Sequence, residues 1–152
     1  MIKKLVLVIC LFIACEKVFC QELEGEWKGS FTKSEVGSAF VMGGQTEISL
    51  LFFKLSDTLF QAFSKTVVKH GKDIDSSICI LTGSFTASNV LTLKEIKSVR
   101  KFAGDTGDDC FQTMELTYNK GKRSLSLEGF WDTDEDRCGH GRIQLTKKIV
   151  AK

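Results

Sequence analysis

The groups in this chain best suited to chemistry lie in two acidic segments, each of which ends in a cysteine. They are DTGDDC at 105–110 and DTDEDRC at 132–138. Clustered carboxylates supply the hard oxygen ligands that calcium prefers. The second segment, however, lacks the glycine at the sixth place and the closing glutamate of an EF-hand loop. We therefore expect solvated acidic turns, with no metal and no other cofactor.

No catalytic motif is present to suggest a reaction. The sequence contains no Gly-x-Ser-x-Gly, no HExxH and no phosphate-cradling glycine loop. The two histidines, His70 and His140, fall in expected loops without the spacing of metal ligands. Glu95, Glu115 and Glu128 are expected to be isolated, outward-facing strand residues, which do not form an acid–base pair. We expect a binding protein and not an enzyme.

Residues 1–20 have the organisation of an export signal. A cationic start, MIKK, precedes an apolar run at 5–14 and a short polar-to-small stretch. The run is shorter than the roughly 20 residues needed to cross a bilayer. We expect residues 21–152 to form one domain in the periplasm or outside the cell, with no transmembrane segment. The alternative is a lipoprotein anchored at Cys15.

Removal of this leader changes the charge balance. The chain has 21 basic and 19 acidic residues; residues 1–20 carry three of the basic and one of the acidic ones, which leaves 18 of each. A neutral domain lacks the basic surplus typical of nucleic-acid-binding proteins, so we expect no nucleic-acid partner.

Three cysteines follow residue 20, and their odd number allows one internal disulfide. An oxidising compartment would favour that bridge. Cys110 and Cys138 lie in expected loops, whereas Cys79 lies within an expected strand. We therefore expect a Cys110–Cys138 bridge.

Alternating apolar and polar residues, separated by turn-forming clusters, predict β structure throughout 21–152. In 124–131, for example, Leu125, Leu127 and Trp131 share one face. Eight strands are predicted, at 26–33, 46–55, 58–68, 77–86, 90–97, 111–119, 124–131 and 141–149.

The connections between these strands alternate between hairpin length and long. In an antiparallel meander, alternate connections lie at opposite ends of the sheet. This predicts an all-β, eight-stranded antiparallel up-and-down barrel shaped like a cup, which removes exposed edges. A two-sheet sandwich is the alternative.

Gly25-Glu26-Trp27, at the start of the first predicted strand, resembles the motif of the lipocalin and calycin superfamily. The resemblance implies that Gly25 and Trp27 form the barrel floor. It also implies that Trp27 packs beneath a basic residue of the last strand, Lys147 or Lys148, and that the barrel holds a small apolar ligand without catalysis. The echo LEGFW at 127–131 ends its strand near the mouth instead, so it is not a structural repeat.

The expected ligand site combines the inner face of the barrel with segment 34–45, which would close over the mouth as a lid. The expected ligand-binding residues are Phe31, Phe40, Met42, Phe52, Met114, Leu116 and Trp131. Two alternatives remain open. Segment 34–45 could be a wide hairpin, and the barrel could be filled by its own side chains. A filled barrel would be a secreted interaction or inhibitor module that acts through its rim loops.

Strands 46–55 and 58–68 are apolar on both faces. Leu51 and Phe53 would then lie on the outside of the barrel, where an apolar patch marks a partner surface. We expect this patch to serve a protein partner or a homodimer.

Overall fold

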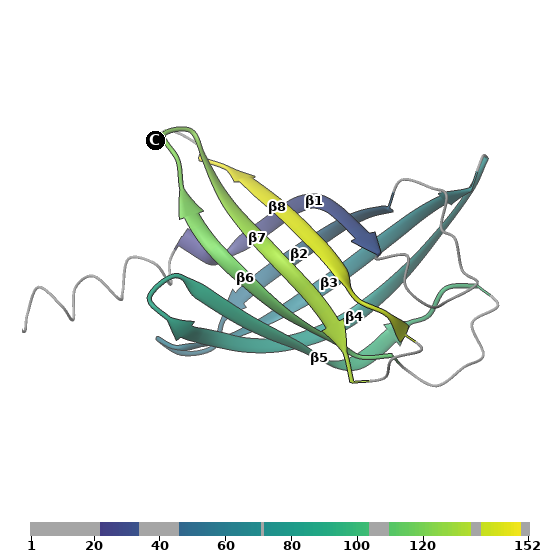
Figure 1. The fold of residues 1–152 in the computed structure, drawn as a ribbon, viewed down its shortest axis with the longest axis horizontal. Coiled ribbons are helices and arrows are strands. Elements are labelled where there is room, and N and C mark those ends of the chain that lie inside the picture. Colours follow the sequence, from purple (N-terminus) through teal and green to yellow (C-terminus); the bar gives the residue numbers. More distant parts are fainter. Residues whose placement is uncertain (1–21, 34–45, 71, 104–109, 135–137, 150–152) are drawn as a thin grey trace, which may run out of the picture.

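The computed structural model describes residues 22–33, 46–70, 72–103, 110–134 and 138–149, which form one closed antiparallel barrel (Figure 1). Consecutive strands pair in chain order, and β1 also pairs with β8. The predicted eight-stranded barrel is therefore confirmed, and the sandwich alternative is wrong. The strands are β1 Gly25–Lys33, β2 Thr46–Lys54, β3 Leu59–His70, β4 Asp73–Ala87, β5 Val90–Arg100, β6 Gln112–Lys120, β7 Ser124–Thr133 and β8 Gly141–Lys148.

Two predicted segments lie outside the described residues, namely the leader at 1–20 and the lid at 34–45, which contains Phe40 and Met42. Both stay predictions. Among the residues that the structure describes, no helix combines the length and apolarity needed to span a bilayer.

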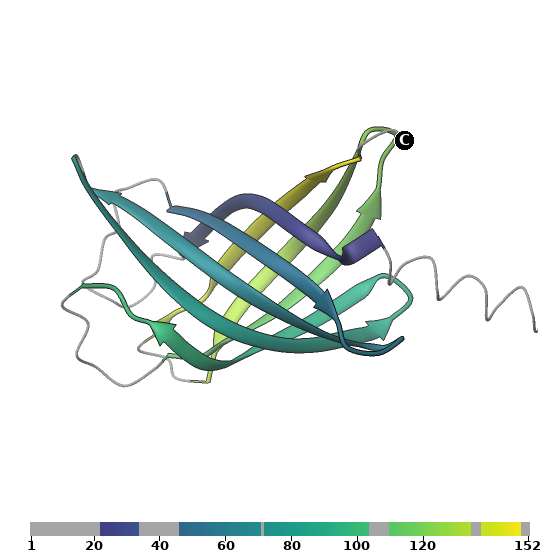
Figure 2. The same cartoon turned by 180° about the vertical axis from the view of Figure 1, so that it is seen from behind.

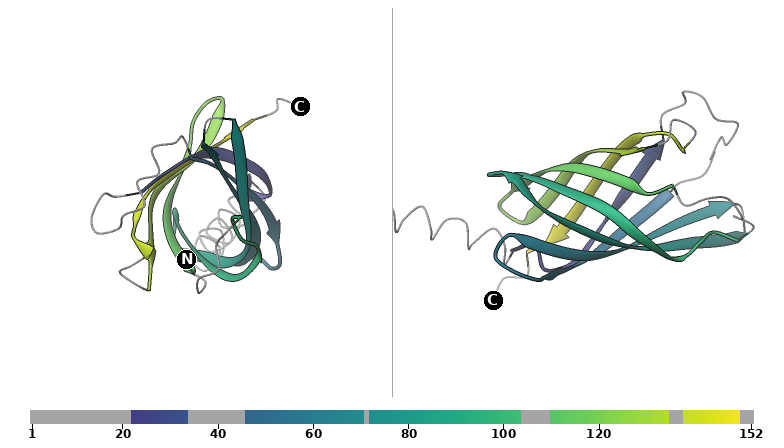
Figure 3. Two further views of the ribbon diagram at one scale, coloured as in Figure 1. Left: turned by 90° about the vertical axis from the view of Figure 1, so that its right-hand side faces the viewer. Right: turned by 90° about the horizontal axis from the view of Figure 1, so that it is seen from below.

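One end of the barrel, which we call the floor, carries the short turns between β2 and β3, β4 and β5, and β6 and β7 (Figures 1 and 2). The described part of the chain starts at this same end with a helical turn at Glu22 and Leu23, and β8 finishes there. A view along the barrel shows the strands surrounding a common axis (Figure 3). The opposite end, the mouth, carries the remaining connections.

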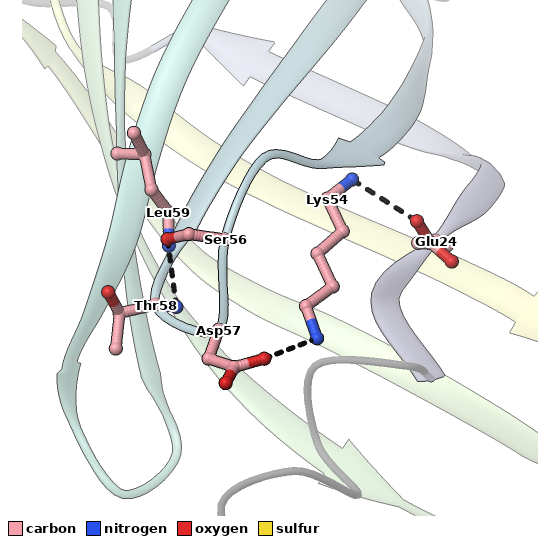
Figure 4. Close-up of polar contacts among 6 residues, drawn as sticks. All are labelled: Glu24, Lys54, Ser56, Asp57, Thr58 and Leu59. Carbon is pink, nitrogen blue, oxygen red and sulfur yellow. Dashed lines mark hydrogen bonds and ion pairs between the residues drawn. The ribbon is translucent and has the colours of Figure 1, made fainter.

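Hydrogen bonds and an ion pair hold the β2–β3 turn at the floor of the barrel (Figure 4). The Ser56 hydroxyl accepts a hydrogen bond from the backbone N–H of Leu59 at 3.1 Å, as Ser does in many turns. The Lys54 ammonium pairs with Asp57 at 2.7 Å, and the Lys54 backbone N–H donates to the Glu24 carboxylate at 3.3 Å. The hairpin is thereby joined to the segment that leads into β1.

One connection at the mouth is shorter than predicted. The polar stretch at 69–76 was expected to be a long loop, but the ladder continues through Lys69↔Ile74 and His70↔Asp73. Polar side chains do not prevent backbone pairing, and Lys69 gains an ion pair with Glu47 at 2.5 Å. His70 therefore ends a strand. The long connections at the mouth are β1–β2, β5–β6 and β7–β8.

The core lies inside the barrel and contains side chains from all eight strands. Most strands alternate buried and more exposed residues along much of their length, as in the pattern of β2. The buried cluster comprises Leu23, Trp27, Ile48, Leu50, Phe52, Phe60, Ala62, Leu81, Leu91, Leu93, Met114, Leu116, Tyr118, Leu125, Leu127, Trp131, Ile143 and Leu145, with Phe31 and Phe85 packed against it.

Two glycines, Gly29 and Gly129, allow neighbouring strands to approach closely. A Cβ atom on Gly129 of β7 would lie 1.9 Å from the carbonyl oxygen of Glu115 in β6, and one on Gly29 would lie 1.7 Å from that of Gln144. No side chain fits at these positions. Gly25, the equivalent of Gly129 in the LEGxW echo, instead has a φ of 101° at the start of β1. Gly129 therefore permits a close approach of two strands, whereas Gly25 permits a positive φ.

We expect Gly129→Ala to lower the free energy of unfolding by about 2–3 kcal/mol, because the added methyl group forces β6 and β7 apart. Urea-induced unfolding of the mature protein measures this change. Glu128→Ala, one residue earlier and exposed, is the control and should stay within about 0.5 kcal/mol of wild type. Equal stability of Gly129→Ala and wild type would contradict the close approach.

Candidate ligand-binding site

Trp27 plugs the floor of the barrel. Its side chain is fully buried, and its indole Nε1–H donates to the carbonyl oxygen of Leu23 at 2.8 Å. The ring makes edge contacts with Phe52 and Tyr118, at centroid distances of 6.3 and 6.4 Å. A buried indole needs a partner for its N–H, and the turn that precedes β1 provides one. The residues just before β1 therefore close the barrel from below.

Lys147 links β8, the last strand, to Trp27 and to the residues just before β1. Its ammonium lies 5.9 Å from the centre of the Trp27 ring and donates to the backbone carbonyl oxygens of Glu22, at 2.9 Å, and of Glu24. Burial lowers the pKa of Lys147, while the Glu24 and Glu22 carboxylates partly oppose this effect. Of the two lysines that the family resemblance left open, Lys147 is the one that lies over the tryptophan.

Glu22, in the turn before β1, binds two side chains of β6. Its carboxylate accepts hydrogen bonds from the Tyr118 hydroxyl, at 2.6 Å, and from the Lys120 ammonium. Burial acts to raise the pKa of Glu22, but the hydrogen bonds and the charges of Lys120 and Lys147 outweigh it, and the net pKa lies below its ordinary value. Burial, the hydrogen bond and the Glu22 charge raise the pKa of Tyr118. Three charged groups therefore hold the floor together.

The second tryptophan lies towards the mouth. Trp131 of β7 is buried and stacks on Phe31 of β1, with ring centres 4.5 Å apart. Its Nε1–H donates to the carbonyl oxygen of Thr32 at 2.8 Å. The indole crosses β8 beside Gly141, where a Cβ atom would lie 2.5 Å from Nε1. The two tryptophans thus mark different levels of the interior.

A polar pair interrupts the apolar wall in the half of the barrel nearer the mouth. Glu95 of β5 and Ser64 of β3 are 6% and 2% exposed, and the Ser64 hydroxyl lies 3.4 Å from Glu95 Oε1. Glu95 Oε2 accepts the backbone N–H of Gln112 at 3.0 Å. The prediction that Glu95 faces outward is wrong, because it follows Leu91 and Leu93 on the buried face of β5.

The other predicted ligand-binding residues divide between the two levels. Phe52 belongs to the floor, against Trp27, whereas Met114 and Leu116 lie fully buried on β6. Met114 pairs with Trp131 across the β6–β7 ladder. Phe31, Met114, Leu116 and Trp131 therefore surround one region above the floor. Sequence patterning identified this wall but missed Ser64 and Glu95, because polar residues were assigned to the outside.

The predicted Cys110–Cys138 disulfide is confirmed, with Cα atoms 5.9 Å apart. It joins the segment before β6 to the segment before β8, and it is consistent with an oxidising, non-cytoplasmic compartment. Cys79 lies in β4, outside this bridge. Within the described ranges no group of three or more His, Cys, Asp or Glu side chains could hold a metal ion, but residues 105, 108, 109 and 136 of the acidic segments fall outside those ranges.

Two features lie on the outer surface of the barrel. The predicted patch on β2 and β3 includes Leu51, Phe53 and Phe63, which are 40%, 42% and 37% exposed, and the two phenylalanine rings meet edge to face. A shallow depression of about 470 Å³ lies over β7, β8 and β1. The Arg142 guanidinium lies 5.4 Å from the exposed Phe130 ring beside it. Phe130 was missed in the sequence because only the inward residues of its strand were considered.

Comparisons with known proteins identify the fold and no more. No protein-family model matches the chain, and no curated protein matches it in sequence. Among solved structures, the chain is similar to a redesigned β-barrel, mFAP1, bound to DFHBI, with a TM-score of 0.57. The alignment covers 84% of this chain and 96% of that chain at 11% sequence identity. The closed eight-stranded antiparallel barrel is therefore shown, while the resemblance to the lipocalin and calycin superfamily stays a prediction.

We expect the Glu22 contacts to make the floor sensitive to acid. The folded-state pKa of Glu22 lies below the unfolded value of about 4.3, so its stabilisation is present above that value and is lost as the pH falls through the folded pKa. Glu22→Gln should cost about 1 kcal/mol at pH 7, and its difference from wild type should shrink as the pH falls from about 5 to 3. Urea-induced unfolding at a series of pH values measures this.

The control for this experiment is Glu26→Gln, which alters an exposed carboxylate on β1. A constant difference between Glu22→Gln and wild type across the pH series would contradict the assigned role of Glu22.

Proposed function

We propose that this protein is an exported binding protein that holds one small, mainly apolar molecule inside its barrel. The observation that carries the proposal is the sealed floor beneath an apolar wall. Trp27, Leu23 and Lys147 close one end of the barrel, and Phe31, Met114, Leu116 and Trp131 form the apolar wall above them. An eight-stranded barrel is wide enough to hold one small ligand.

Two further observations support the proposal. The redesigned β-barrel of similar fold is bound to DFHBI, which agrees with ligand binding by a barrel of this kind. The disulfide and the predicted leader at 1–20 agree with export. Segment 34–45, with Phe40 and Met42, remains the proposed lid over the mouth, where it would complete the apolar enclosure.

We expect native mass spectrometry of the mature protein to show a bound small molecule that is lost on denaturation. Leu116→Trp should reduce the bound fraction, with about tenfold weaker affinity, because the larger side chain occupies the ligand space. The control is Thr117→Trp, which places the same side chain on the exposed face of β6. A bare protein mass, with no binding of added apolar probes, would contradict the proposal.

A second candidate function is self-association through the outer face of β2 and β3. One observation favours it, namely the contiguous exposure of Leu51, Phe53 and Phe63, which Leu55 and Leu59 extend to the β2–β3 turn. Contiguous apolar side chains on an outer sheet face are typical of a protein–protein contact. The partner in this candidate function is a second copy of this chain.

Sedimentation velocity tests this second candidate. We expect wild type to form a dimer that Phe63→Lys weakens by about tenfold or more, because a charge enters the apolar contact. Val99→Lys is the control, since Val99 is 55% exposed on β5, away from the patch. A wild-type protein that stays monomeric at high concentration would exclude self-association.

A further inference from the structure

The floor end of the barrel carries a cluster of basic residues where the β6–β7 turn meets the end of β8 (Figure 1). Ser124 pairs with Lys148 in the β7–β8 ladder, and the backbone N–H of Ile149 donates to the carbonyl oxygen of Arg123 at 3.2 Å. The turn also contributes Lys122. We call Lys122, Arg123 and Lys148 the basic corner, and all three residues are exposed.

Carboxylates do not neutralise the basic corner. The Glu22 carboxylate at the floor already pairs with Lys120, and the charge of Lys147 also acts on it. Among the described residues, the ion pairs do not include any member of the basic corner. Residues 21–152 carry equal numbers of basic and acidic residues, so this corner is a local positive surface on a neutral domain. Such a surface attracts an anionic partner in one orientation.

Exposed apolar side chains share the floor end with the basic corner. Ile149 directly follows Lys148 and is 42% exposed, while Leu55 and Leu59, on either side of the β2–β3 turn, are 56% and 42% exposed. Basic residues beside exposed apolar ones are typical of a surface that lies on a membrane, where the apolar groups enter the headgroup region and Lys or Arg meets anionic lipid. A soluble anionic polymer would leave these apolar side chains in water.

We propose that the floor end docks on a membrane surface rich in anionic phospholipid, with the basic corner against the phosphate groups and Ile149 at the interface. Charge complementarity carries this inference, because each Lys or Arg near an anionic membrane strengthens binding by about fivefold. Docking at the floor leaves the mouth, at the opposite end of the barrel, facing away from the membrane. The inference is therefore independent of what the barrel holds and can fail without affecting the proposed function.

Cosedimentation of the mature protein with lipid vesicles tests this inference. We expect wild type to bind vesicles of phosphatidylcholine and phosphatidylglycerol in equal parts about tenfold or more tighter than vesicles of phosphatidylcholine alone. Added salt should weaken this binding, because it screens the charges at the membrane surface. Equal binding to the two kinds of vesicle, or binding to neither, would overturn the inference. Binding to heparin without binding to the vesicles would also overturn it, and would assign the basic corner to an anionic polysaccharide.

Two double variants locate the contact on the molecule. Lys122→Gln combined with Arg123→Gln should bind the phosphatidylglycerol vesicles about twentyfold more weakly than wild type. The control is Lys65→Gln combined with Lys97→Gln, which makes the same change in net charge at exposed positions of β3 and β5, away from the floor. It should bind like wild type. Equal losses in the two double variants would show that net charge and not the basic corner governs binding, and would overturn the inference.

Discussion

The pairing of the first strand with the last is the constraint on which the rest of this structure depends. Six residue pairs, from Lys28↔Thr146 to Lys33↔Gly141, join β1 to β8 and remove both edges of the sheet. This closure brings Lys147 of β8 over Trp27 of β1, and it turns an apolar sheet face into an interior. It also brings the backbones of β1 and β8 so close together at Gly29 that a Cβ atom there would lie 1.7 Å from the carbonyl oxygen of Gln144.

The two copies of Leu-Glu-Gly-x-Trp place one tryptophan at the floor of the barrel and the other nearer its mouth. In both, the indole is buried and its N–H donates to a backbone carbonyl oxygen. Trp27 bonds to Leu23, four residues earlier, and so seals the floor with local chain. Trp131 bonds to Thr32 of β1 across the closure, and so supports the wall beside Phe31. Ser64 and Glu95 are buried polar residues that interrupt the apolar wall in the half of the barrel nearer the mouth.

Much of the fold could be predicted from the sequence, because alternation of apolar and polar residues indicates strands with one face buried and the other exposed to solvent. Leu125, Leu127 and Trp131 fell on the interior for this reason, and the loop positions of Cys110 and Cys138 indicated their bridge. The inward position of Glu95 could not be read in the same way, since the alternation rule assigns a glutamate to water. The extra length of β3 and β4 was equally hidden, because their polar ends pair through backbone groups that every residue carries.

We propose that the barrel encloses an apolar cavity above Trp27, and xenon binding tests this most directly. Xenon enters apolar cavities that water leaves empty. Crystals of the mature protein, refolded after extraction with organic solvent, would be pressurised with the gas. We expect xenon inside the barrel, among Met114, Leu116 and Trp131 and on the floor side of Glu95. An interior without xenon, with side chains in mutual contact from Trp27 to the mouth, would contradict the claim.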